Sequence, residues 1–165
     1  MDEIAKPEQL LEKLADDLEK LLEARKIDNP LMVGIHTGGA WIANTLHRKL
    51  GLTQPLATLD ISFYRDDFSR IGMHPRVKPS SLPPQVEDKH IILVDDVLQT
   101  GRTIRAAMNE IFDYGRPASI TLVCLVDRSG RESPIQADII GQHLQLSAEQ
   151  HIKLNGPEPL EFVIT

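Results

Sequence analysis

The chain has 165 residues, the length of one ordinary domain with a full hydrophobic core. Its formal net charge of −6 argues against indiscriminate binding to nucleic acid, which usually requires a basic surface, but leaves room for a local basic patch. The single cysteine excludes an internal disulfide, and no apolar run approaches the roughly 20 residues of a membrane span. We therefore expect one domain over 1–165, in the cytoplasm.

Helix and strand signals alternate along the chain. Leucines at helical spacing predict an amphipathic helix over 7–25. The apolar run 31–35 predicts a strand, and 40–50 a helix that Gly51 ends. Further elements are expected as strands at 56–64, 90–95, 119–126, 138–144 and 160–164 and as a helix at 103–114. This alternation predicts an α/β fold with a doubly wound, mostly parallel sheet.

The segment at about 66–89 has little hydrophobic periodicity and exceeds the usual connection of about 4–6 residues. It carries scattered basic side chains, including Arg76, in an otherwise acidic chain. We expect a flexible flap that closes over a ligand and shields the reacting atoms from water. The alternative is an ordinary solvated loop.

The stretch IILVDDVLQTGRT at 91–103 is the most informative. A buried strand leads to Asp95 and Asp96, at the edge where open α/β sheets bind ligands. The small-residue loop that follows precedes a helix, so its backbone N–H groups predict a phosphate site. Carboxylates beside it can accept hydrogen bonds from sugar hydroxyls, or hold a hydrated cation. These features predict a phosphorylated, sugar-like ligand; the alternative is that the aspartates only cap the helix.

A second anion loop is predicted at Thr37, Gly38 and Gly39, between a strand and a helix. Adjacent glycines let backbone N–H groups approach an anion closely, although an ordinary turn would use them too. The histidines show no metal-ligand spacing. Trp41 is expected to belong to the core rather than to a stacking platform.

These motifs, with LDISFYRDD at 59–67 and LVDRSGRESPIQAD at 125–138, resemble the PyrR family of uracil phosphoribosyltransferases. The resemblance covers about 31–144. It implies the type I phosphoribosyltransferase fold, with a flap and a small hood. It also implies formation of UMP and pyrophosphate from uracil and 5-phosphoribosyl-1-pyrophosphate (PRPP). Mg²⁺ would arrive with PRPP rather than in a protein metal site, and the protein would be a homodimer or homotetramer.

The same resemblance implies roles for individual residues. Asp95 and Asp96 would hold the ribose hydroxyls and, with Arg128, form the catalytic set. The implied substrate-binding residues are Thr37, Gly38, Gly39, Arg76, Val97, Leu98, Gln99, Thr100, Gly101, Arg102, Thr103, Val126, Asp127 and Ile152. Gly38 stands where many relatives carry a pyrophosphate-binding arginine, so the flap is expected to meet part of that charge. For Arg128 the alternative is a salt bridge to Glu132 or Asp138.

A competing hypothesis is a regulator that senses UMP or UTP in this pocket and binds the messenger RNA leader of pyrimidine genes, with or without enzyme activity. Relatives that bind RNA carry extra basic residues in the segment matching 127–138. This chain has Gly130 and Gln136 at two of those positions and keeps Arg128 and Arg131. A third possibility is that the base is a purine, because no single residue fixes the choice of base.

Overall fold

A five-stranded sheet forms the centre of the structure, a computed structural model that describes residues 3–61, 82 and 86–165. Every neighbouring pair of strands in this sheet is parallel, and their order is β2-β1-β3-β4-β5. The strands are β1 (Leu31–Ile35), β2 (Ala57–Leu59), β3 (His90–Leu98), β4 (Ser119–Arg128) and β5 (Ile139–Leu144).

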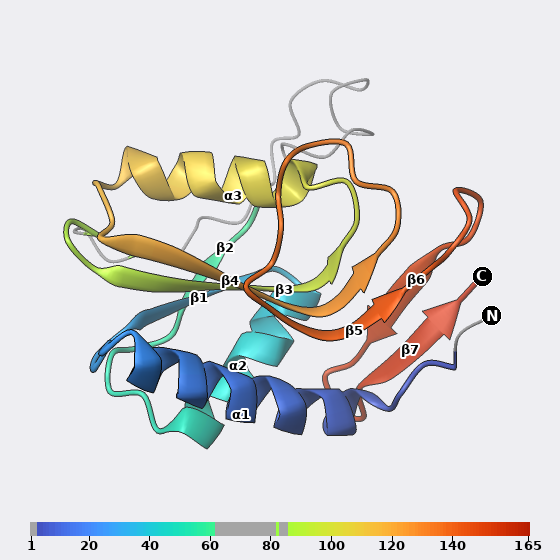
Figure 1. Cartoon of the computed structure of the whole chain (residues 1–165), viewed down its shortest axis with the longest axis horizontal. Coiled ribbons are helices and arrows are strands. Elements are labelled where there is room, and N and C mark those ends of the chain that lie inside the picture. Colours follow the sequence, from blue (N-terminus) through green and yellow to red (C-terminus); the bar gives the residue numbers. More distant parts are fainter. Residues whose placement is uncertain (1–2, 62–81, 83–85) are drawn as a thin grey trace.

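Helices cover both faces of the sheet (Figure 1). Helices α1 (Pro7–Ala24) and α2 (Gly38–Leu50) lie on one face and α3 (Arg102–Asp113) on the other. Residues of β3 alternate between two buried clusters: Ile92 packs with α1 and α2, whereas Ile91 packs with α3. The predicted doubly wound parallel sheet is therefore confirmed. In the described part of the chain, no helix combines the length and apolar content that a bilayer crossing requires.

A two-stranded antiparallel ribbon stands beside the sheet, close to both chain ends (Figure 1). It consists of β6 (Ile152–Asn155) and β7 (Glu161–Ile164), and β6 contacts β3. This ribbon corresponds to the small hood that the resemblance implies. The sequence predicted β7, which contains the apolar run Phe162–Ile164, but not β6, in which Lys153 separates the two apolar residues Ile152 and Leu154.

Two strands extend beyond their predicted ends. The ladder between β3 and β4 continues through Val97 opposite Val126 and Leu98 opposite Asp127. Asp96 therefore lies within β3 rather than after it, and Asp95, expected as the last residue of the strand, is followed by three more strand residues. Similarly, α2 begins at Gly38 rather than at residue 40.

Most of the predicted flap, with Arg76, lies outside the described residues, and so does the end of the strand predicted at 56–64. Val86, within the predicted flap, is fully buried in the cluster on the α3 side of the sheet. The boundary predicted at 89 is therefore too late, because the chain has rejoined the core by residue 86.

Candidate functional site

Two adjoining cavities surround the carboxyl end of β3. The smaller, of about 220 Å³, is lined by Asp95, Val97, Leu98, Gln99, Thr100, Gly101, Thr103, Ile104 and Ile152. The larger, of about 510 Å³, is lined by Thr37, Gly38, Trp41, Asp96, Val97, Ile152, Lys153 and Leu154. Both share Val97 and Ile152, so they meet where the hood strand β6 reaches β3.

Asp95 and Asp96 serve different cavities. Successive side chains of a strand point to opposite faces, and Asp95 lines the smaller cavity while Asp96 lines the larger. The side-chain Oδ1 of Asp95 accepts a hydrogen bond from the Asp96 N–H at 2.9 Å, and Oδ1 of Asp96 accepts one from the Val97 N–H at 2.8 Å. These bonds orient the two carboxylates at the entrance to adjoining cavities.

The predicted phosphate loop (residues 99–103) leads from β3 into α3 beside the smaller cavity. Gly101 is the N-cap of α3 with φ 91°, a left-handed conformation that favours glycine. The first turns of α2 and α3 contain no acidic residue. Because a helix N-terminus carries partial positive charge and unpaired N–H groups, both helices present a favourable environment for anions.

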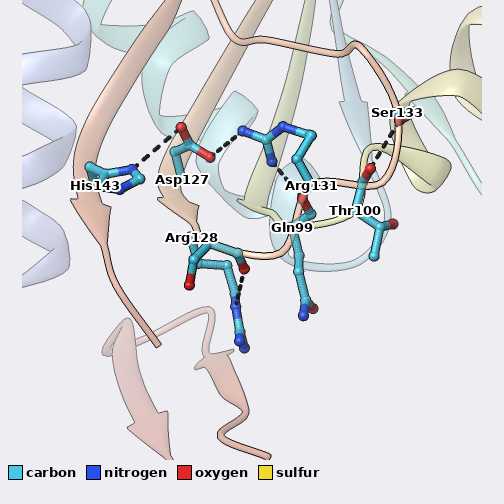
Figure 2. A network of polar contacts seen from close by, with 8 residues as sticks. Gln99, Thr100, Asp127, Arg128, Arg131, Ser133 and His143 are labelled. Carbon is cyan, nitrogen blue, oxygen red and sulfur yellow. Dashed lines mark hydrogen bonds and ion pairs between the residues drawn. The ribbon is translucent and has the colours of Figure 1, made fainter. Parts of the chain in front are cut away.

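A second loop lies directly behind the phosphate loop (Figure 2). We call residues 129–135 the brace loop. The Arg131 guanidinium donates to the Gln99 carbonyl at 2.5 Å and to the Asp127 carboxylate at 2.6 Å. The Thr100 carbonyl accepts hydrogen bonds from the Glu132 N–H at 3.0 Å and from the Ser133 hydroxyl at 2.9 Å.

The first turn of α2 packs tightly against β3. A β-carbon at position 38 would lie 2.1 Å from Oδ2 of Asp96, and one at position 39 would lie 2.6 Å from the Val94 carbonyl oxygen. Backbone atoms of β3 therefore require glycine at position 39, whereas a side chain at position 38 would displace the Asp96 carboxylate. The sequence alone did not reveal this close approach. The His36–Thr37 peptide bond that precedes them is cis.

Arg128 does not form the salt bridge that was the alternative expectation for it. Its side chain is buried, and its guanidinium donates to the carbonyls of Ser129 at 3.2 Å, Ser147 at 2.9 Å and Gln150 at 2.7 Å. Burial lowers the pKa of Arg128. The predicted salt bridge is wrong: Glu132 pairs with Arg102 and Asp138 with Arg25. A direct catalytic role for Arg128 stays a prediction, but its guanidinium is already bonded to carbonyls of the 147–150 turn.

Four other predicted site residues do not line the two cavities. Gly39 and Val126 are buried, Arg102 is exposed, and Asp127 is held by Arg131 with His143 Nδ1 at 3.6 Å (Figure 2). Of these, Asp127 contacts the brace loop through Arg131, and Arg102 contacts it through Glu132 at 3.3 Å.

Sequence reasoning missed several lining residues. Trp41 packs against the core, as expected, and it also lines the larger cavity, one helical turn after Gly38. Residues three apart lie on the same face of a helix, so the spacing of Gly38 and Trp41 could have indicated that both line the site. Lys153 and Leu154 follow Ile152 on the unpredicted strand β6, and Ile104 opens α3.

Cys124 is not a nucleophile for this site. It is fully buried in β4, and burial raises the pKa of its thiol, an effect to which the neighbouring carboxylates of Asp95 and Asp96 add. Within the described ranges, no group of three or more His, Cys, Asp or Glu side chains is placed to hold a metal ion. Asp95 and Asp96 offer oxygen donors at two separate cavities.

A family model described as "Phosphoribosyl transferase domain" matches residues 1–155. A "Bifunctional protein PyrR" from Pseudomonas aeruginosa strain LESB58 is 57% identical over 154 residues, which cover 93% of this chain and 91% of the relative. A protein of the same name from Nitrosococcus oceani is 57% identical over 157 residues, which cover 94% and 89%.

Solved structures share the fold at lower identity. A purine phosphoribosyltransferase from Pyrococcus horikoshii matches with a TM-score of 0.62 and 22% identity over 82% of each chain. A hypoxanthine phosphoribosyltransferase from Staphylococcus aureus matches with a TM-score of 0.66 and 22% identity, covering 88% of this chain and 78% of the other. At these identities the likeness concerns the fold alone.

Proposed function

The chain belongs to the PyrR family of phosphoribosyltransferases, and we propose that its paired cavities bind PRPP and uracil and form UMP and pyrophosphate. The observation that carries this proposal is the arrangement around the end of β3. Two helix N-termini, each without an acidic residue in its first turn, stand beside adjoining cavities, and each cavity contains one aspartate. Such a site fits a sugar that carries a phosphate group at both ends.

The 5-phosphate is assigned to the smaller cavity, where the phosphate loop and the start of α3 provide backbone N–H groups and the hydroxyls of Thr100 and Thr103. The pyrophosphate is assigned to the larger cavity, beside the first turn of α2. Lys153 is the cationic side chain among the described residues that line it. The ribose would then lie across the end of β3, within reach of Asp95 and Asp96.

Mg²⁺ fits this donor set. It prefers oxygen ligands and commonly binds through one or two carboxylates together with substrate phosphates, and Asp95 and Asp96 supply carboxylates next to the proposed pyrophosphate and ribose positions. The ion would offset the charge of the departing pyrophosphate. The chain's own contribution is to hold the ribose and both phosphate groups in line with the base nitrogen and to exclude water.

The base is assigned to the junction of the two cavities. Ile152 lines both of them and presents an apolar surface to a flat ring. The ends of β3 and β4 are paired at Leu98 and Asp127, and backbone groups there could bind the polar edge of a base. Membership of the PyrR family supports uracil as that base.

The direct test is UMP formation from uracil and PRPP by the purified protein, compared with an Asp95→Asn, Asp96→Asn double variant. A matched control is Asp16→Asn, Asp17→Asn, which removes the same two charges from consecutive aspartates on α1. We expect activity in the wild type and control and its loss in the site variant. Equal rates in all three, or turnover with hypoxanthine but not uracil, would overturn the proposal.

A second candidate function is regulation of pyrimidine genes by UMP-dependent or UTP-dependent binding to a messenger RNA leader. The relatives' printed name, "Bifunctional protein PyrR", supports it. A gel-shift assay with the leader RNA of the chain's own pyrimidine genes, with and without UMP, tests it. Light scattering on the same sample tests the proposed homodimer or homotetramer.

A further inference from the structure

The brace loop contacts the phosphate loop at two successive carbonyl groups. Arg131 donates to the Gln99 carbonyl at 2.5 Å, while the Glu132 N–H and the Ser133 hydroxyl donate to the Thr100 carbonyl at 3.0 and 2.9 Å. Figure 2 shows Arg131 lying between Asp127 and Gln99, and Ser133 beside Thr100. Both carbonyls therefore point toward the brace loop.

The direction of a carbonyl fixes the direction of the N–H in the same peptide. In a trans peptide the C=O and the N–H of the next residue point in opposite directions, and the peptides after Gln99 and Thr100 are trans. The N–H groups of Thr100 and Gly101 thus point away from the brace loop, on the side of the smaller cavity that these residues line. Neither N–H donates to an acceptor within the described ranges.

Arg131 also brings positive charge to the rear of the phosphate loop. Its side chain is 27% exposed and that of its partner Asp127 is 16% exposed. A charged donor in this sheltered position forms stronger hydrogen bonds than a neutral one. It holds the Gln99 carbonyl, whose partial negative charge would repel a phosphate, away from the cavity.

We propose that Arg131 is a positioning residue that orients the backbone N–H groups of the phosphate loop toward the 5-phosphate of PRPP or UMP. Because Arg131 also holds Asp127 at the end of β4, it links the phosphate loop to the strand end assigned to the base. This inference rests on the proposed function for the identity of the ligand as PRPP or UMP. The hydrogen bonds themselves require only that the ligand carries a sugar phosphate.

The test is the affinity of wild-type protein, Arg131→Ala and Arg131→Lys for ribose 5-phosphate, measured by calorimetry. This probe contains the phosphate but neither base nor pyrophosphate. The matched control is Arg105→Ala, which removes an exposed arginine from the first turns of α3. Circular dichroism and thermal unfolding verify that each variant is folded.

We expect Arg131→Ala to weaken ribose 5-phosphate binding by roughly tenfold to a hundredfold, the range for loss of charge-assisted hydrogen bonds. Arg131→Lys should recover only part of the affinity. Lysine keeps the positive charge, but its single ammonium group cannot bond both the Gln99 carbonyl and the Asp127 carboxylate as the planar guanidinium does. In turnover, the KM for PRPP should rise more than the KM for uracil.

Ribose 5-phosphate binding that is unchanged in folded Arg131→Ala, or equally weakened in Arg105→Ala, would overturn the inference. Absence of binding to the wild type would overturn it as well. If the wild type binds ribose 5-phosphate in an Arg131-dependent way but forms no UMP from uracil, the inference stands and the proposed function fails.

Discussion

Gly38 and Asp96 lie in such close contact that a β-carbon on residue 38 would stand 2.1 Å from Oδ2 and 2.6 Å from Cγ of Asp96. The Asp96 carboxylate cannot simply rotate away, because its Oδ1 accepts a hydrogen bond from the Val97 N–H at 2.8 Å. A glycine at position 38 is thus matched to the position of a carboxylate in the proposed site.

Gly38→Ala should therefore displace Asp96 and raise the KM for PRPP by about tenfold or more, since a hydrogen bond to a charged group contributes roughly 1.5–3 kcal/mol. Steady-state kinetics measure this. The control is Gly51→Ala at the end of α2, where φ is 61° and nothing lies within 4 Å of the added β-carbon. That variant should lose about 1 kcal/mol of stability through backbone strain and keep its KM. Equal KM values in both variants would contradict the prediction.

Lys153→Gln should raise the KM for PRPP severalfold, because Lys153 supplies positive charge to the larger cavity. The difference in KM between the variant and the wild type should shrink as ionic strength rises, because salt screens the attraction between the exposed Lys153 and the phosphates of PRPP. Lys20→Gln, on the exposed face of α1, is the control with the same charge change. The prediction fails if both variants respond to salt like the wild type.

The single tryptophan, Trp41, should report ligand binding directly. It lines the larger cavity together with Asp96 and Ile152, so a bound nucleotide or pyrophosphate changes the polarity around the indole ring. Titration with UMP or PRPP should give a saturable change in Trp41 fluorescence. Unchanged emission at ligand concentrations that calorimetry shows to be saturating would exclude Trp41 from the site.

Arg128→Ala should destabilise the fold by about 2–4 kcal/mol. The substitution removes the donor that the carbonyls of Ser129, Ser147 and Gln150 share, and the site of the lost side chain is buried. Urea unfolding measures this. Arg105→Ala, exposed on α3, should change the free energy of unfolding by less than about 0.5 kcal/mol. Comparable stabilities of the two variants would show that the 147–150 turn does not depend on Arg128.

Cys124 should be inert to thiol reagents in the folded protein. Its pKa is raised by burial and by the nearby aspartates, so at pH 8 its thiolate fraction lies below that of an exposed cysteine, and the thiolate is the reactive form. Reaction with Ellman's reagent should begin only when urea unfolds the chain. Rapid labelling of native protein would contradict this.

The sequence predicted the parts of the fold that depend on local patterns. The parallel sheet follows from buried strand runs alternating with helices, and the phosphate loop from the small residues between β3 and α3. Strand ends were less accurate, because the extension of β3 past Asp96 depends on its pairing with β4.

The hydrogen-bond partners of the side chains could not be predicted either, because they also depend on contacts between segments that are distant in the sequence. Arg128 donates to carbonyls 19 and 22 residues away, and Arg131 to a carbonyl 32 residues away. No local period in the sequence records such contacts. Trp41 packs against the core as expected, but its second position, in the wall of the larger cavity, depends on where β6 lies.

Arg128, the last residue of β4, and Arg131, in the brace loop, also change how the segment 127–138 should be compared across relatives. Arg128 is buried and bonded to carbonyls of its own chain, and Arg131 is paired with the Asp127 carboxylate, so the segment offers less accessible positive charge to a polyanion than its sequence suggests. Contacts within the chain alone can account for both arginines, Arg128 through the 147–150 turn and Arg131 through the phosphate loop. Their presence in a relative is therefore no diagnostic of a regulatory protein.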